Sequence, residues 1–272
     1  MKAIGFFISI LFLQLQSSAQ ELWLEPQKFS YQAGEKNFIR FRSGENFVGQ
    51  NWTGSRENIA LLRAFSTNYQ YDLLPFMGMA KGDSARLDTM NFAGNFTIAY
   101  QSQFSQQQMD AASFNAMLNN NGLANVLLWR QENNKDTAMG KFSFQQSAKA
   151  LVRIKSTMKK SDYMKSSFIA YSVSLPLEIV PLDNPYNIKE ATTMQFNIFL
   201  WNRPARDGLV KVWHTVNGHT EVKTLQVIKG LVDIPLEPTG SWMISIVKMD
   251  PIKNNPTADW QGYSSSLSFN YE

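Results

Sequence analysis

The stretch Leu175–Tyr186 reads L-P-L-E-I-V-P-L-D-N-P-Y, and we expect it to divide the chain into two parts. Its apolar residues form a compact run bracketed by Pro176 and Pro181, which is typical of a short strand. The D-N-P that follows indicates a turn, because proline disfavours the helical region for the residue before it and Asx side chains favour turns. We interpret the stretch as the first strand of a second domain.

The residues after this strand alternate in a regular rhythm. Short apolar runs recur through residues 175–272, separated by Asn, Gly and Pro turn signals. Such spacing is typical of an antiparallel β-sandwich. We therefore expect residues 175–272 to form a C-terminal β-sandwich domain.

The residues before the strand are less regular. Alternating segments predict strands over much of residues 20–174, but the period changes near Ser105. Ser105 and Gln108 fit a capping box, and Gly122 is well placed as a C-terminal stop. We therefore expect an N-terminal β-sandwich domain with a helical insertion at about residues 105–131, so that the fold class is mainly all-β.

Residues 1–19 carry the features of a secretory signal peptide. Lys2 precedes a short apolar run, and small residues end at Ala19. A basic start, an apolar core and small residues at the cut predict export and cleavage after Ala19. A membrane anchor is the alternative, but the run is shorter than the roughly 20 residues of a spanning helix. We expect a mature protein that does not span a membrane.

Composition excludes several classes of site. The chain has no cysteine, which excludes disulfides, thiolate ligands and a cysteine nucleophile. The net charge of +4 comes from scattered residues, so a nucleic-acid partner is not expected. Nucleophile-elbow, zinc-protease, Walker and dinucleotide-binding motifs are all missing, which predicts a protein that is not an enzyme. Sugar stacking on tryptophans is an alternative function, with four candidate residues: Trp23, Trp52, Trp201 and Trp260.

The two histidines of the sequence lie in one segment, V-W-H-T-V-N-G-H-T-E-V at residues 212–222. The N-G pair predicts a hairpin with a two-residue turn, which places His214 opposite Glu221 and both on the same face as His219. Two imidazoles and a carboxylate suit zinc, copper or nickel. We predict a divalent transition-metal site at His214, His219 and Glu221. The alternative is a solvated hairpin tip that carries polar residues.

Several passages resemble the NikM-like family of exported proteins of unassigned function. They are E-L-W-L-E-P (21–26), F-N-A-M-L-N-N-N-G-L (114–123), S-A-K-A-L-V-R-I (147–154), L-E-I-V-P-L-D-N-P-Y (177–186), G-S-W-M-I-S (240–245) and D-W-Q-G-Y-S-S-S-L-S-F (259–269). The family is described as a substrate-specific component of nickel or cobalt uptake. The resemblance implies a periplasmic protein with immunoglobulin- or transthyretin-like β domains, which hands a metal ion to a transporter.

These observations together predict a periplasmic, non-enzymatic binding or accessory protein. Its specific form would be a nickel- or cobalt-type uptake component whose partner is an inner- or outer-membrane transport component. Two alternatives remain: a structural or interaction module of a cell-envelope complex that holds no metal, and a carbohydrate-binding protein.

Overall fold

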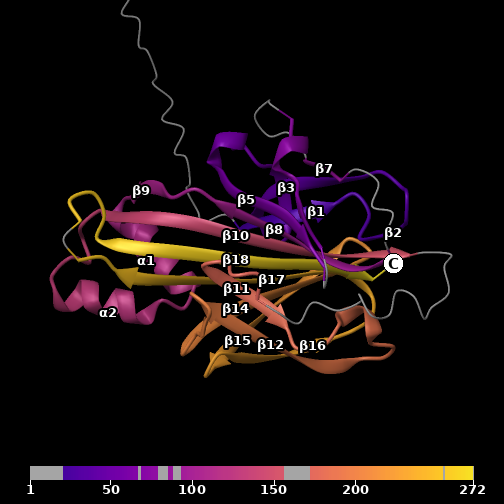
Figure 1. Ribbon diagram of the computed structural model, residues 1–272. Coiled ribbons are helices and arrows are strands. Elements are labelled where there is room, and N and C mark those ends of the chain that lie inside the picture. Colours follow the sequence, from indigo (N-terminus) through magenta and orange to yellow (C-terminus); the bar gives the residue numbers. More distant parts are fainter. Residues whose placement is uncertain are drawn as a thin grey trace, which may run out of the picture.

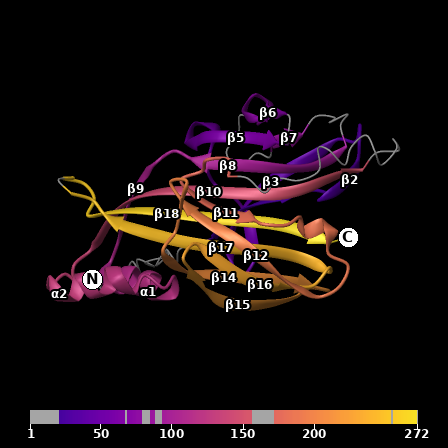
Figure 2. The same ribbon diagram turned by 60° about the horizontal axis from the view of Figure 1, so that its bottom comes forward.

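The structure is a computed structural model that describes residues 21–66, 69–78, 85–87, 93–155, 172–253 and 255–271. These residues are mainly β, as the sequence predicts, and they contain two α-helices (Figure 1). Strands of the first half lie on one side of the long strands β10 and β18, and most strands of the second half lie on the other (Figures 1 and 2).

The first half of the chain contributes ten strands and both α-helices within the described ranges. The strands are β1 (Glu21–Pro26), β2 (Ser30–Gln32), β3 (Asn37–Glu45), β4 (Val48–Asn51), β5 (Ile59–Phe65), β6 (Gln70–Asp72), β7 (Ala85–Leu87), β8 (Gly94–Ser102), β9 (Ser105–Met109) and β10 (Gly140–Lys155). The helices are α1 (Ala111–Asn120) and α2 (Ala124–Glu132), and short 3-10 turns cover Arg56–Asn58 and Leu74–Phe76.

The described residues of the second half form strands and one 3-10 turn. The strands are β11 (Leu177–Pro181), β12 (Thr192–Leu200), β13 (Arg203–Pro204), β14 (Asp207–Val216), β15 (His219–Ile228), β16 (Leu231–Leu236), β17 (Gly240–Pro251) and β18 (Trp260–Tyr271), and the turn is Pro185–Asn187. The quoted stretch therefore does begin a strand, β11, and its D-N-P segment leads into that turn.

Two hydrophobic cores fill the spaces between the layers. In the first, the sheet β1-β3-β4 packs on β5, β8 and β10 through residues such as Leu24, Ile39 and Ile98. In the second, β11, β12 and β16 pack on β14, β17 and β18 through residues such as Phe196 and Ile244. Each core is the apolar interior of a sandwich-like arrangement.

Strand β10 contributes to both cores, and β18 is its neighbour in the sheet. They pair in parallel from Phe142 opposite Trp260 to Ala150 opposite Ser268, so one sheet continues across the predicted boundary at residue 174. On β10, Ala150 faces the first core and Leu151 the second. The division into two domains stays a prediction, and the shared sheet means that the two halves are not merely linked by a loop.

The predicted helical start at Ser105 is wrong. Ser105–Met109 is strand β9, which pairs antiparallel with residues 140–144 of β10. The first helix begins after Asp110, whose side chain accepts a hydrogen bond from the Ser113 backbone N–H at 2.9 Å. Ser and Gln at this spacing also occur in polar strands, so the capping-box pattern alone does not distinguish a helix from a strand. Here the edge of β10 is available for pairing, and the segment joins it as a strand. Gly122 separates α1 from α2 with a φ of +67°, as predicted for a helix stop.

Neither α1 nor α2 could cross a membrane, since no helix in the described ranges has the required length and apolar character.

Candidate functional site

A groove of about 320 Å³ opens where β12 and β17 begin and β16 ends. The β14–β15 hairpin forms its other side. Its walls combine apolar residues with six polar ones: Thr192, Thr193, His214, Glu221, Lys223 and Glu237. With two carboxylates against one ammonium group, the groove favours a cationic ligand over an anionic one.

The hairpin that carries the groove is the one predicted from sequence. Asn217 and Gly218 have φ values of +50° and +79°, which a two-residue turn of type I′ requires. Val216 pairs with His219 and His214 with Glu221, and this register is confirmed over the whole of β14 and β15. Residues directly opposite each other in paired strands share a face, so the groove receives His214 and Glu221 together.

The ring of His214 is held in one orientation. It stacks on Trp242 with a centroid separation of 3.8 Å and an angle of 13° between the planes. Its Nε2 lies 2.9 Å from the carbonyl oxygen of Thr239. A carbonyl can only accept, so Nε2 must carry the proton. In the neutral ring, Nδ1 is then an unprotonated nitrogen with a free lone pair.

Trp242 fixes this geometry from the neighbouring strand β17. It is 4% exposed and lies parallel to Phe269 on its far side, at an angle of 10°. Its Nε1–H donates to the same Thr239 carbonyl at 3.0 Å. The pairing of β17 with β14 places Trp242 directly beside His214, so both rings converge on one acceptor.

The structure brings two of the three predicted ligands to the groove. His214 and Glu221 line it, whereas His219 is exposed at the hairpin tip and is not among the lining residues. In the ranges that the structure describes, no three His, Asp or Glu side chains converge as a metal ion would need. The three-ligand metal site stays a prediction, and the geometry favours the pair His214 and Glu221.

The four tryptophans considered for sugar stacking differ in their exposure. Trp23 and Trp260 are buried in the packing, each 2% exposed. Trp52 is half-buried against Phe41. Trp201, the exposed member of the four, presents its ring edge-on to Tyr263. A sugar site needs an open aromatic face, and three of these four rings are committed to packing.

A comparison with protein families matches one family, described as Domain of unknown function (DUF4198), over residues 17–250 of the chain. This chain belongs to DUF4198. The match covers the first core, the groove and the hairpin residues His214 and Glu221, and it ends before β18. No curated protein matches the chain.

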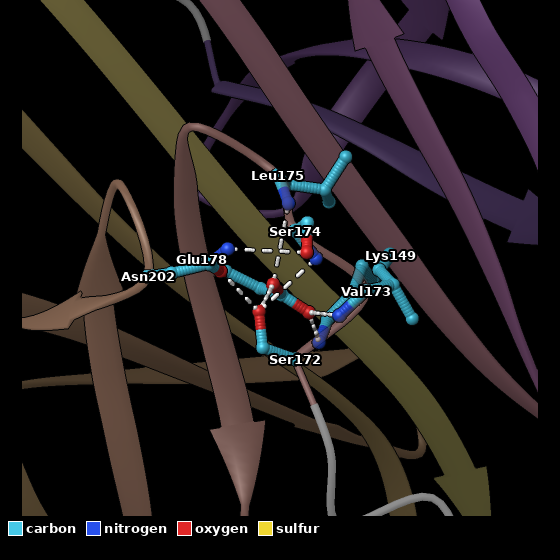
Figure 3. Close-up of polar contacts among 7 residues, drawn as sticks. All are labelled: Lys149, Ser172, Val173, Ser174, Leu175, Glu178 and Asn202. Atoms are coloured by element: carbon cyan, nitrogen blue, oxygen red, sulfur yellow. Dashed lines mark hydrogen bonds and ion pairs between the residues drawn. The ribbon is translucent and has the colours of Figure 1, made fainter.

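A second polar cluster of this DUF4198 protein lies between its two halves (Figure 3). The Nζ of Lys149 on β10 is 2.8 Å from Oε1 of Glu178 on β11, and the two side chains are 2% and 0% exposed. Glu178 also accepts hydrogen bonds from the Ser172 hydroxyl at 2.6 Å and from the backbone N–H of Val173 at 2.9 Å. A buried ion pair is tolerated only when its remaining hydrogen-bonding capacity is met in this way.

Sequence reasoning missed this cluster, although a signal exists. Both residues interrupt apolar runs, Lys149 within S-A-K-A-L-V and Glu178 within L-P-L-E-I-V. A charged residue at a position where both neighbours are buried points to a buried partner. The partner itself could not be identified, because 29 residues separate the two.

The environment of Glu178 alters its pKa. Burial alone would raise the pKa of this carboxyl, but the Lys149 ammonium and the hydrogen bonds from Ser172 and Val173 outweigh it. The pKa of Glu178 therefore lies below its ordinary value. The ionised carboxylate consequently stabilises the fold above the unfolded-state pKa of about 4.3, and that stabilisation is lost as the pH falls through the lower folded-state value.

This linkage predicts an acid-dependent stability. The free energy of unfolding of the wild type should fall as the pH drops below about 4, because the unfolded Glu178 then binds a proton that the folded one resists. The variant Lys149→Met/Glu178→Leu lacks the group and should show a flatter acid limb. Urea unfolding between neutral pH and pH 3 measures both slopes. Equal acid slopes in the two proteins would contradict the assignment.

Proposed function

We propose that this protein is a periplasmic, non-enzymatic binding protein of the NikM-like kind, exported with a signal peptide that is cleaved after Ala19. Its groove binds a divalent transition-metal ion in nickel- or cobalt-type uptake. The ion passes to an inner- or outer-membrane transport component. The observation that carries the proposal is the orientation of His214, with Nε2–H on the Thr239 carbonyl and Nδ1 left free.

The hydrogen bond to Thr239 is the kind of contact that metal-ligating histidines make. Such a histidine usually donates its other ring N–H to a carbonyl or carboxylate, which fixes the tautomer and raises the basicity of the ligating nitrogen. In this chain the carbonyl of Thr239 supplies that contact and Trp242 holds the ring plane. The orientation is therefore prepared before any ion binds, which lowers the entropy cost of binding.

Carboxylates near His214 supply further donors. Glu221 lies directly opposite it in the hairpin, and Glu237 lines the same groove. Imidazole and carboxylate together suit zinc, copper and nickel. With fewer than three converging protein ligands among the described residues, the remaining coordination positions would belong to water or to a small chelating solute.

Single-residue variants test this proposal. Nickel, zinc or copper ions should each be added to the mature protein and the midpoint of thermal unfolding followed. At a free-metal concentration of about 100 times Kd, binding to the native state stabilises it by about 2.7 kcal/mol. His214→Ala should abolish the shift, and His219→Ala, the matched control directly after the turn, should retain most of it. Acidification should weaken binding, because only a neutral imidazole ligates.

Other outcomes would exclude parts of the proposal. A wild type that shows no metal-dependent shift at neutral pH would remove metal binding altogether. Equal losses in His214→Ala and His219→Ala would move the site from the groove to the hairpin tip. A shift that survives in both variants would place the ion elsewhere on the chain.

A second candidate function, an interaction module of a cell-envelope complex, is favoured by one specific observation. Strand β15 is exposed along most of its length, and Val227 is the one residue of the strand that is buried. An exposed strand of this kind can recruit another chain.

A further inference from the structure

Strand β15 lies at the margin of its sheet. It pairs with β14 over its full length, but with β16 only at Ile228 opposite Leu231, where a tight turn joins them. Within the described parts of the chain, no strand pairs with its other edge between His219 and Val227. Both views place β15 at the outer limit of the second half (Figures 1 and 2). Val222, near its centre, is 54% exposed.

The turn determines which backbone groups this edge presents. In a hairpin with a two-residue turn, the closing pair Val216 and His219 exchanges hydrogen bonds, and the pattern then alternates along the strand. Glu221 and Lys223 therefore direct their backbone N–H and C=O toward β14. Thr220, Val222 and Thr224 direct theirs outward. Three successive outward residues form a ready template for an added strand.

The side chains of β15 favour a copy of itself as that strand. A two-fold axis at Val222 would pair the strands antiparallel and place Glu221 of each copy opposite Lys223 of the second copy. Thr220 would then lie opposite Thr224 of the second copy. Glu221 and Lys223 would occupy non-hydrogen-bonded pairs, in which facing Cα atoms are about 4.5 Å apart and side chains are closest. Opposite charges at such positions are stabilising.

Other registers lack this complementarity. An axis at Glu221 or at Lys223 would place that charge opposite its own copy, which is destabilising. An axis at Thr224 would put Lys223 opposite Leu225 of the second copy and pair no charges. An axis at Thr220 would overlap little more than the hairpin tip. The charge pattern thus selects the register centred on Val222, and the outward hydrogen-bonding groups are compatible with it.

We propose that two copies of this protein associate through antiparallel pairing of β15, centred on Val222. The resulting contact is isologous and closes with two-fold symmetry. Thr220, Val222 and Thr224 of the two copies form three hydrogen-bonded pairs across the contact. With two backbone hydrogen bonds for each pair, the dimer gains roughly six in total. Glu221 and Lys223 also line the groove, so the dimer would bring two grooves together on one face of the joined sheet.

Charge reversal tests the register. The metal-free mature protein should show a monomer–dimer equilibrium in sedimentation velocity. Glu221→Lys and Lys223→Glu each turn two attractive pairs into two repulsive ones, and each should weaken dimerisation by at least about tenfold. The double variant Glu221→Lys/Lys223→Glu restores opposite charges and should return the dimer to within a few-fold of the wild type. Glu132→Lys, an exposed change of the same charge on α2, should have no effect.

A backbone variant adds an independent measurement. Val222→Pro removes an outward N–H that makes no bond within the β14 ladder, so the monomer should fold and the dimer should be lost. A wild type that stays monomeric up to its solubility limit would overturn the proposal. So would a Glu221→Lys protein that dimerises like the wild type, or a double variant that fails to recover. These measurements contain no metal, so they do not depend on whether the groove binds one.

Discussion

Lys149→Met should lower the free energy of unfolding by about 3–5 kcal/mol, one of the two largest effects expected in this protein. The substitution keeps the volume of the side chain but removes the ammonium group that lies 2.8 Å from Glu178. The carboxylate would then be buried without a compensating charge, and its exposure of 0% leaves no water to replace the lysine. Urea unfolding at neutral pH measures the loss.

The double variant Lys149→Met/Glu178→Leu is the matched control. Replacing both partners of a buried ion pair with apolar residues is often neutral or stabilising, so its stability should lie close to that of the wild type or above it. A single variant as stable as the wild type would show that the pair is hydrated in solution. A double variant as unstable as the single one would assign the loss to packing and not to charge.

The second large effect concerns the fragment 175–272. We expect it to show no cooperative thermal transition. The fragment keeps most of the second core but loses β10, which pairs with nine residues of β18 and supplies both Leu151 and Lys149. The edge of β18 would be left open and Glu178 left without its partner. Circular dichroism during heating, with residues 20–272 as reference, measures the outcome.

A variant fragment separates the two causes. Glu178→Leu in residues 175–272 removes the orphaned carboxylate, while the edge of β18 that β10 would cover stays open. Recovery of a cooperative transition would assign the instability to charge, and no recovery would assign it to the missing strand. A cooperative transition in the unmodified fragment would instead support a domain boundary at residue 174.

The features predicted correctly from sequence are those decided by neighbouring residues. The turn at Asn217 and Gly218 fixes the hairpin register through its own φ values, so the pairing of His214 with Glu221 followed directly. The alternating runs of the second half likewise gave its strands. In each case the pattern and the structure depend on residues a few positions apart.

The features that were missed depend on distant pairings. Ser105 lies in a strand because β10 offers an edge some 40 residues later, which the local capping pattern does not reveal. The ring of His214 is oriented by Trp242 on β17 and by the carbonyl of Thr239, the residue just before that strand. His219 stayed outside the groove because the hairpin tip extends past the lining residues. None of these partners is adjacent in sequence, so the spacing of residues could not predict them.

The position of β18 has a consequence for how the molecule assembles. Its Ser266 and Ser268 hydroxyls donate to the carbonyls of Leu22 and Leu24 on β1, 2.6 and 2.5 Å away and 244 residues distant in the sequence. Contacts of such long range form late and slowly, because the loop between them must close first. Until β18 docks, β10 and β17 each present an uncovered edge to neighbouring molecules. Refolding yield should therefore depend steeply on protein concentration, and mutations in β18 should slow the recovery of native protein more than equally destabilising mutations in the β14–β15 hairpin.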